Sequence, residues 1–201
     1  MKSILVPTAL VSAALLSGCG ATQQVATPAP APKPPAAAAA VAAAAPAASP
    51  AELFVVLPDT GRVHAFGDTK NYFDFLSHGE VQLTRTRIGA GPGGKTLVYG
   101  ITGDDVKNNQ PRRGEQLLEG SVPVGAPFYG EAFKNGRFYL FGDLKDMKDF
   151  TAFGEVPYSY TEIGAGPKGE TLVFVMNKDS YAKGKPMERK QRFQALRMAQ
   201  K

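Results

Sequence analysis

The sequence predicts an α+β domain, made of two ββαββ-type internal repeats packed about a pseudo-two-fold axis, that follows a disordered Ala/Pro linker. Three observations favour this architecture. The second half of the chain repeats the first at a constant offset of 75 residues. Each copy alternates short strand-like runs with one helix-like stretch. Residues 20–50 are almost entirely Ala and Pro and contain too little apolar patterning to form a core.

The internal repeat is the strongest signal in the sequence. Residues 61–107 and 136–182 align without a gap, and 22 of 47 positions are identical. A single copy of about 70 residues is marginally stable by itself, so we expect the two copies to share one core. We refer to residues 51–120 as the first segment and to residues 121–201, which end in a basic helix, as the second segment.

Each segment begins with a predicted hairpin. Its turn contains a glycine in both copies, and in the second copy the turn is Asn135-Gly136, a dipeptide that favours tight hairpins. Later in each segment, two further strand-like runs flank a Gly- and Pro-rich turn. The predicted strands are Leu53–Leu57, Arg62–Phe66, Leu83–Ile88, Thr96–Ile101, Phe128–Phe133, Arg137–Phe141, Tyr158–Ile163 and Thr171–Met176.

A helix is predicted between the two hairpins of each segment. Asp68 and Asp143 stand at N-cap positions, where a carboxylate accepts the free first-turn amides. Gly79 and Gly154 stand where a C-cap glycine is expected. Two further helices are predicted after prolines that occupy equivalent positions, and they cover Arg112–Leu118 and Met187–Ala199.

The N-terminus has the features of an export signal. Lys2 precedes a short apolar run that ends at Leu16-Ser17-Gly18-Cys19. This tetrapeptide resembles the lipobox of bacterial lipoproteins. The resemblance implies that residues 1–18 are a signal peptide and that Cys19, the only cysteine, carries lipid such as palmitate. Residues 19–50 are then a lipid-anchored tether. Gly20 after the cysteine implies the outer membrane, with the domain facing the periplasm.

The net charge and the predicted export together limit the kinds of molecule that this protein can bind. The formal net charge is +5, but an exported protein does not meet nucleic acid or nucleotides. We therefore expect a membrane contact through Cys19 and binding to an envelope protein or a cell-wall polymer. The C-terminal helix is one possible interaction surface, through Arg189, Lys190, Arg192 and Arg197. The alternative is that Phe193 and Leu196 dock this helix on the domain and leave its basic face in water.

One motif resembles a phosphate-binding loop. Gly89, Gly94, Lys95 and Thr96 fit the pattern G-x-x-x-x-G-K-T. That chemistry needs a helix after the lysine, whereas a strand is predicted here, and the second copy has Glu170 in place of Lys95. The stretch is therefore interpreted as a hairpin turn, and no cofactor is expected.

The leading hypothesis is a non-enzymatic envelope lipoprotein whose duplicated domain binds a partner. No histidine or cysteine cluster has the spacing of metal ligands. The alternative is a hydrolase of envelope polymers, in which Asp68 with Glu80, or Asp143 with Glu155, supplies an acid and a base. If the two aspartates instead cap helices, this alternative loses its candidates. A third hypothesis, an assembly subunit, predicts an exposed apolar patch or an unpaired sheet edge.

Overall fold

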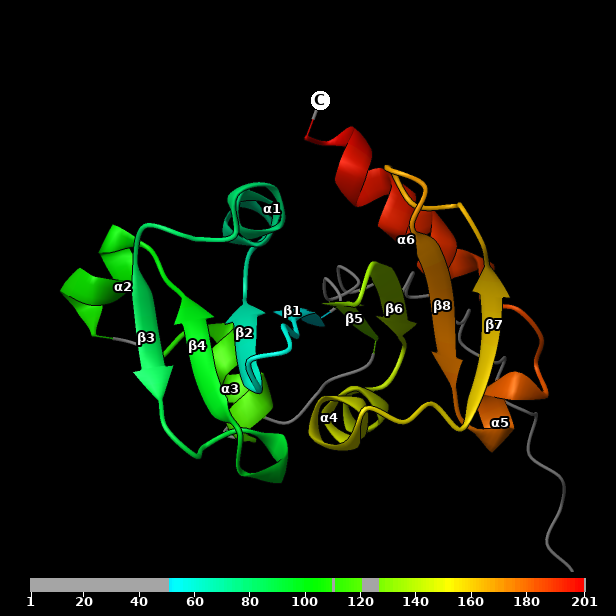
Figure 1. Cartoon of the computed structure of the whole chain (residues 1–201), viewed down its shortest axis with the longest axis horizontal. Helices are drawn as coiled ribbons and strands as arrows, with labels where there is room; N and C mark the ends of the chain where they lie inside the picture. The colour runs from blue at the N-terminus through cyan, green and yellow to red at the C-terminus, as the bar shows by residue number, and fades with distance from the viewer. Residues whose placement is uncertain (1–50, 110, 121–126, 201) are drawn as a thin grey trace, which may run out of the picture. The chain divides into compact units, whose positions relative to one another are not determined.

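A mixed eight-stranded sheet forms the centre of the domain in a computed structural model (Figure 1). The structure describes residues 51–109, 111–120 and 127–200. The proposed signal peptide, Cys19 and the tether lie outside the described residues. The strand order is β3–β4–β2–β1–β5–β6–β8–β7.

The first segment contributes four strands and three α-helices. Strands β1 and β2 form an antiparallel hairpin, helix α1 follows, and β3 and β4 form a second hairpin. A short 3₁₀ helix, η1, lies in the β3–β4 connection. The bounds are β1 Ala51–Val56, β2 Arg62–Phe66, α1 Thr69–His78, β3 Thr84–Arg87, η1 Pro92–Gly94, β4 Thr96–Gly100, α2 Gly103–Asn108 and α3 Arg113–Glu119.

The second segment follows the same order of strands and α-helices. Its two hairpins are β5–β6 and β7–β8, with helix α4 between them. The bounds are β5 Phe128–Lys134, β6 Arg137–Phe141, α4 Leu144–Phe153, β7 Tyr158–Glu162, β8 Thr171–Met176, α5 Lys178–Tyr181 and α6 Met187–Met198.

Parallel pairing joins the hairpins into one sheet. Within each segment the second strand pairs with the fourth, β2 with β4 and β6 with β8. Strand β1 pairs with β5 over six residues and so connects the two segments at the centre of the sheet. Parallel pairs need long connections, and here the intervening helices provide them.

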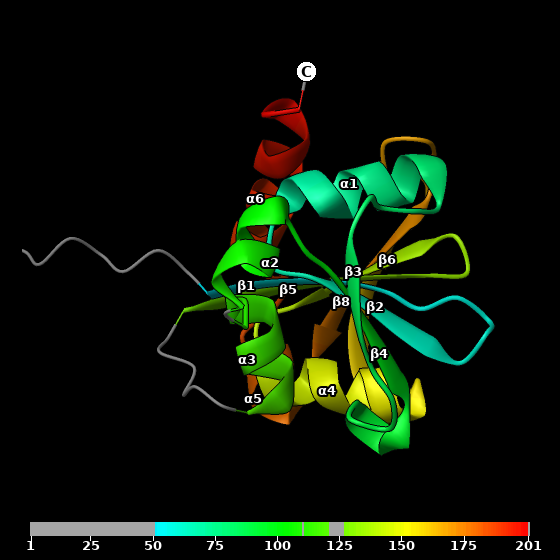
Figure 2. The same cartoon turned by 90° about the vertical axis from the view of Figure 1, so that its left-hand side faces the viewer.

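The helices cover both faces of the sheet (Figures 1 and 2). Helices α3 and α4 pack on the face to which Leu53 and Val55 of β1 point. Helices α1 and α6 pack on the other face, with Phe54 and Val56. Successive residues of a strand point to opposite faces, so the almost continuous apolar sequence of β1 fills two cores.

The local features of the sequence prediction are confirmed. All eight strands, the helices between the hairpins and the two later helices form within a few residues of the expected bounds. Asp68 and Asp143 are N-caps, and Gly79 and Gly154 end their helices with φ of 79° and 76°. The helices α2 and α5 were not predicted. The result is a mixed α/β domain, in agreement with the predicted α+β class.

None of the helices in the described parts of the chain is long and apolar enough to span a bilayer.

Candidate functional site

A groove of about 550 Å³ lies on the outer strands of the second segment, beside the end of α4. Its lining combines one charged side chain, three aliphatic hydroxyl groups, a tyrosine ring and aliphatic groups. The nine residues are Arg137, Tyr139, Gly154, Val156, Ser159, Thr161, Ile163, Thr171 and Val173.

The first segment carries nearly the same residues at the equivalent positions. Seven of the nine are identical at the offset of 75 residues, against 22 of 47 over the aligned stretch. The two differences keep the chemistry, because His64 replaces a tyrosine ring and Thr84 replaces a serine hydroxyl. We call the two sets the retained faces. The first comprises Arg62, His64, Gly79, Val81, Thr84, Thr86, Ile88, Thr96 and Val98.

The register of the sheet brings these side chains together. Arg62 lies opposite Thr96, and His64 lies opposite Val98, which also faces Thr86 across the next pair. In the second segment Arg137 lies opposite Thr171 in the same way. Each retained face is therefore a small patch across three neighbouring strands.

The flanking helix supports the aromatic ring of each face. His64 packs on Phe75 of α1 with ring centroids 4.6 Å apart, and Tyr139 packs on Phe150 of α4 at 4.4 Å. Burial and the neighbouring Arg62 lower the pKa of His64 below its ordinary value. His64 is therefore uncharged at neutral pH.

Two features of the retained faces are not explained by packing within the domain. Ile88 and Ile163 are each 88% exposed, although an isoleucine contributes to stability mainly when it is buried. Arg62 and Arg137 are exposed, and neither side chain donates a hydrogen bond or forms an ion pair to another of the described residues. The hydroxyl groups of Thr86 and Thr161 are likewise exposed. These groups are available to a ligand.

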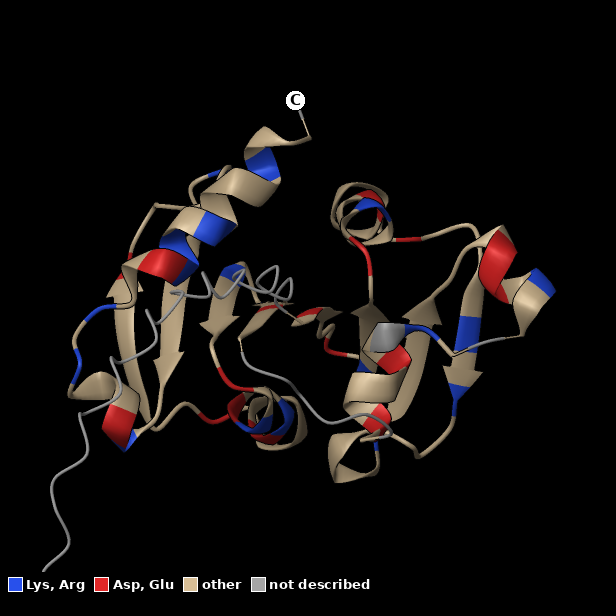
Figure 3. Ribbon diagram, turned by 180° about the vertical axis from the view of Figure 1, so that it is seen from behind, with Lys and Arg blue, Asp and Glu red and all other residues tan. Residues whose placement is uncertain are grey.

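Lys and Arg positions are blue on the ribbon of α6 in Figure 3. The four basic side chains that were predicted as an interaction surface all contact the domain itself. Arg189 donates to the carbonyl oxygens of Leu140 and Val175, at 3.2 and 2.6 Å. The other three form ion pairs, Lys190 with Glu162, Arg192 with Glu52 and Arg197 with Glu131. Phe193 and Leu196 are buried, so the helix is docked on the domain as the alternative expected. Its basic face is not left in water, because the four basic side chains bind groups of the domain.

The proposed catalytic aspartates cap helices. Asp68 Oδ1 accepts the Asn71 amide at 2.8 Å, and its Oδ2 accepts from Arg112. Asp143 Oδ1 accepts the amides of Lys145 and Asp146 at 2.7 and 3.2 Å. The hydrolase alternative therefore loses its main candidates. Among the described residues, no three His, Cys, Asp or Glu side chains could share a metal ion.

The loop that resembles a phosphate-binding motif is a turn between strands. Thr96 begins β4, where phosphate binding needs the start of a helix. Lys95 Nζ donates to the carbonyl oxygen of Thr151 in α4 at 2.6 Å. The lysine therefore connects this turn to the second segment. This contact does not bind phosphate, and the residue at the equivalent position of the second segment is Glu170.

Sequence reasoning missed a buried polar cluster on the α1 and α6 face. Glu131 of β5 is fully buried, and the hydroxyl groups of Tyr72 and Tyr129 donate to it at 2.6 and 2.9 Å. Arg197 completes the cluster. The available signal was a carboxylate inside the apolar run of β5, at the position that Val56 occupies in the first segment. A buried charge requires partners, but their identity depends on tertiary packing.

No family model matches this chain, and neither the curated proteins nor the solved structures contain a significant match. The function therefore has to be argued from the site alone.

Proposed function

We propose that this chain is a non-enzymatic, lipid-anchored protein of the bacterial cell envelope whose domain binds a cell-wall polymer through the two retained faces. The lipobox at Leu16–Cys19 supports the anchor and the outer-membrane location. The observation that carries the binding function is the preservation of seven residues out of nine in both retained faces, with the arginine, one threonine and the isoleucine exposed in each.

We also propose that a pseudo-two-fold axis relates the two segments. The two segments have equivalent elements in the same order, and their equivalent helices α1 and α4 cover opposite faces of the sheet. A two-fold axis between the parallel strands β1 and β5 accounts for both facts. It relates the retained faces as two copies of one binding surface.

The chemistry of the faces favours an anionic glycan. An unpaired arginine offers a fork of donors to a carboxylate. The neighbouring Thr and Ser hydroxyl groups match sugar hydroxyls, and Tyr139 or His64 presents the edge of a ring. The exposed isoleucine adds apolar contact. Carboxylates, hydroxyl groups and apolar ring faces occur together in cell-wall glycans, whereas a partner protein needs a larger apolar interface.

Two equivalent faces on one domain also suit a repeating polymer. Each face offers a small number of contacts, so we expect it to bind weakly by itself. The two faces lie on opposite sides of the sheet, so a polymer network that surrounds the domain can engage both. The second contact then becomes intramolecular and the combined affinity rises. The tether and the lipid confine the domain near the wall and raise its local concentration there.

Co-sedimentation of the purified full chain with cell-wall sacculi, in mild detergent at low and high salt, tests this proposal. We expect specific binding, which the double variant Arg62→Gln/Arg137→Gln weakens by about 10-fold or more, the usual effect of losing a charged hydrogen bond. Each single variant should have a smaller effect than the double variant. The control Lys107→Gln/Lys178→Gln removes the same charge from exposed helix positions outside both faces.

The possible outcomes separate the alternatives. Equal loss in the arginine double variant and in the lysine control would reduce the binding to general basicity, which salt screens. No binding to sacculi in either salt would reject the wall polymer, and cross-linking at Ile88 and Ile163 in intact envelopes would then identify a protein partner.

A further inference from the structure

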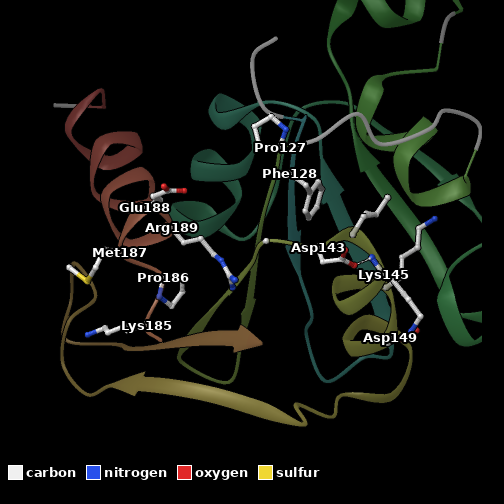
Figure 4. A pocket seen from close by; sticks show the side chains of 13 residues that line it. Pro127, Phe128, Asp143, Lys145, Asp149, Lys185, Pro186, Met187, Glu188 and Arg189 are labelled. Carbon is white, nitrogen blue, oxygen red and sulfur yellow. Dashed lines mark hydrogen bonds and ion pairs between the residues drawn. The ribbon is translucent and has the colours of Figure 1, made fainter. Parts of the chain in front are cut away.

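A cavity of about 940 Å³ lies between the start of α4 and the start of α6 (Figure 4). It is separate from the retained faces. Asp143, Lys145 and Asp149 form one wall on α4, and the residues around Pro186 form the opposite wall (Figure 4). The lining residues are Pro127, Phe128, Gly142, Asp143, Leu144, Lys145, Lys148, Asp149, Lys185, Pro186, Met187, Glu188 and Arg189.

The equivalent place in the first segment is closed by a tight contact. Arg112 forms ion pairs with Asp68 and Asp105 and so ties the start of α3 to the start of α1. The backbones of Gly67 and Gly114 also touch, because a Cβ on Gly67 would lie 3.1 Å from the Gly114 nitrogen. No side chain separates the two helices at this point.

Two replacements remove this contact in the second segment. Met187 stands in the position of Arg112, so Asp143 has no arginine to tie it to α6. Arg189 stands in the position of Gly114, and its guanidinium fills the space over Gly142. A Cβ on Gly142 would lie 2.8 Å from Arg189 Nε. The arginine side chain lies between the start of α4 and the start of α6 and keeps them apart, which leaves the cavity beside it.

Two cations of the lining form no ion pair with a carboxylate of the described residues. Arg189 donates only through Nη1, to two carbonyl oxygens. Burial lowers the pKa of Arg189, and the charge of Asp146 partly opposes this effect. Lys148 makes no hydrogen bond or ion pair with the described residues, and burial lowers its pKa as well.

Most of the other charged side chains of the lining form ion pairs or hydrogen bonds with the protein. Lys145 pairs with Asp149 at 2.6 Å, and Lys185 pairs with Glu162. The Asp143 carboxylate accepts two helix amides. Glu188 is exposed. Phe128, Leu144 and Met187 supply apolar surface beside the two available cations.

We infer that this cavity binds a small organic carboxylate that bears an apolar side group. The guanidinium nitrogens of Arg189 that make no hydrogen bond to the described residues receive the carboxylate. Lys148 adds positive charge to the lining, and Phe128, Leu144 and Met187 contact the apolar group. The volume is in the range of small-molecule sites. Such a ligand has two possible sources, the carboxyl end of a wall peptide or a free aliphatic acid, and both share the chemistry that the cavity recognises.

Isothermal titration of the full chain with N-acetyl-D-alanyl-D-alanine, its C-terminal amide and 4-methylpentanoate tests the inference. We expect at least one of the acids to bind, and we expect the amide to bind about 10-fold more weakly than its acid. Binding of the dipeptide alone assigns the site to wall peptides, whereas preference for 4-methylpentanoate assigns it to a free acid.

Three variants connect the binding to this cavity. Arg189→Gln should weaken the acid by about 10-fold, with the urea midpoint checking the fold. Met187→Arg restores the arginine of the first segment and should fill the cavity and abolish binding, with the urea midpoint checking the fold. Lys178→Gln removes one charge outside the cavity and should have no effect.

The inference is overturned if neither acid binds up to about 10 mM, which is weaker than ordinary specific recognition. It is also overturned if the acid and the amide bind equally, or if Met187→Arg keeps the affinity. Binding to sacculi through the retained faces should survive Met187→Arg, so failure here is distinguishable from failure of the proposed function.

Discussion

Arg197 and Glu131 form a buried ion pair between α6 and the central strand β5, with Nη2 2.5 Å from Oε1. The guanidinium also lies over the ring of Phe193, 3.3 Å from its centroid, and over Phe138 at 4.7 Å. Tyr72, which belongs to the first segment, donates to the same carboxylate. This pair therefore fixes the C-terminal helix and joins the two segments on one face of the sheet.

Removal of one member of this pair should destabilise the domain strongly. Arg197→Met leaves Glu131 buried without its cation, and breaking such a pair costs about 3–5 kcal/mol. Arg192→Met on the same helix breaks a more exposed pair with Glu52 and should cost about 1 kcal/mol or less. Urea unfolding at neutral pH measures both values. Equal costs would show that Glu131 does not depend on Arg197.

Alkaline pH should destabilise the domain through three tyrosines. Burial, the largest cause, and then a neighbouring glutamate raise the pKa of Tyr72, Tyr99 and Tyr129. In the unfolded chain a tyrosine ionises near pH 10. The folded state keeps the protons above that pH, so this contribution is complete below about pH 10 and is lost as the pH rises further.

The loss should amount to about 1.4 kcal/mol per pH unit for each tyrosine. Urea unfolding at several pH values between about 9 and 12 measures the slope. Tyr72→Phe should reduce it by the share of one tyrosine. An unchanged slope in both Tyr72→Phe and Tyr129→Phe would contradict the assignment.

Mild acid should lower the free energy of unfolding of the domain through His64, a residue of the first retained face. Its pKa is lowered in the folded state, mainly by burial. The stability that the neutral ring contributes is present above about pH 6.5 and is lost as the pH falls below it. His64→Tyr places the ring of the second segment on Phe75 and should remove this loss. The advantage of the variant in free energy of unfolding should grow between about pH 7 and 5, and Tyr139→His should show the opposite trend.

Membrane attachment should depend on Cys19. Cys19→Ser removes the thiol to which lipid is expected to be attached, and several buried methylene groups at about 0.8 kcal/mol each are needed for a stable anchor. We expect the variant in the soluble fraction and without an acyl mass by mass spectrometry. A variant that stays acylated and membrane-bound would reject the lipobox interpretation.

The sequence predicts local structure well in this protein because the local signals agree with one another. Asp68 and Gly79 mark the two ends of α1, and Asn135-Gly136 forms the β5–β6 turn with φ of 50° and 71°. The strand order was not predictable in the same way. The parallel pairing of β1 with β5 joins residues that are far apart in the chain, and no turn specifies it.

The candidate sites depend on tertiary packing to different degrees. The polar residues shared by the copies were visible in the sequence, but only the register showed that Arg62, Thr86 and Thr96 lie on one patch. The basic face of α6 was a reasonable hypothesis from charge alone. Its partners Glu52, Glu131 and Glu162 come from distant strands, so their effect was not visible in the sequence of the helix.

The position of β1 has a mechanical consequence. The described chain enters the domain at Ala51, the first residue of a strand that is hydrogen-bonded on both sides, to β2 and to β5. Tension applied from the N-terminal side therefore acts along these two ladders and shears many hydrogen bonds at once. A strand at the edge of the sheet, pulled away from its single neighbour, would instead break its hydrogen bonds one after another. A domain pulled between a membrane and a rigid wall would keep its fold at higher forces with this connection.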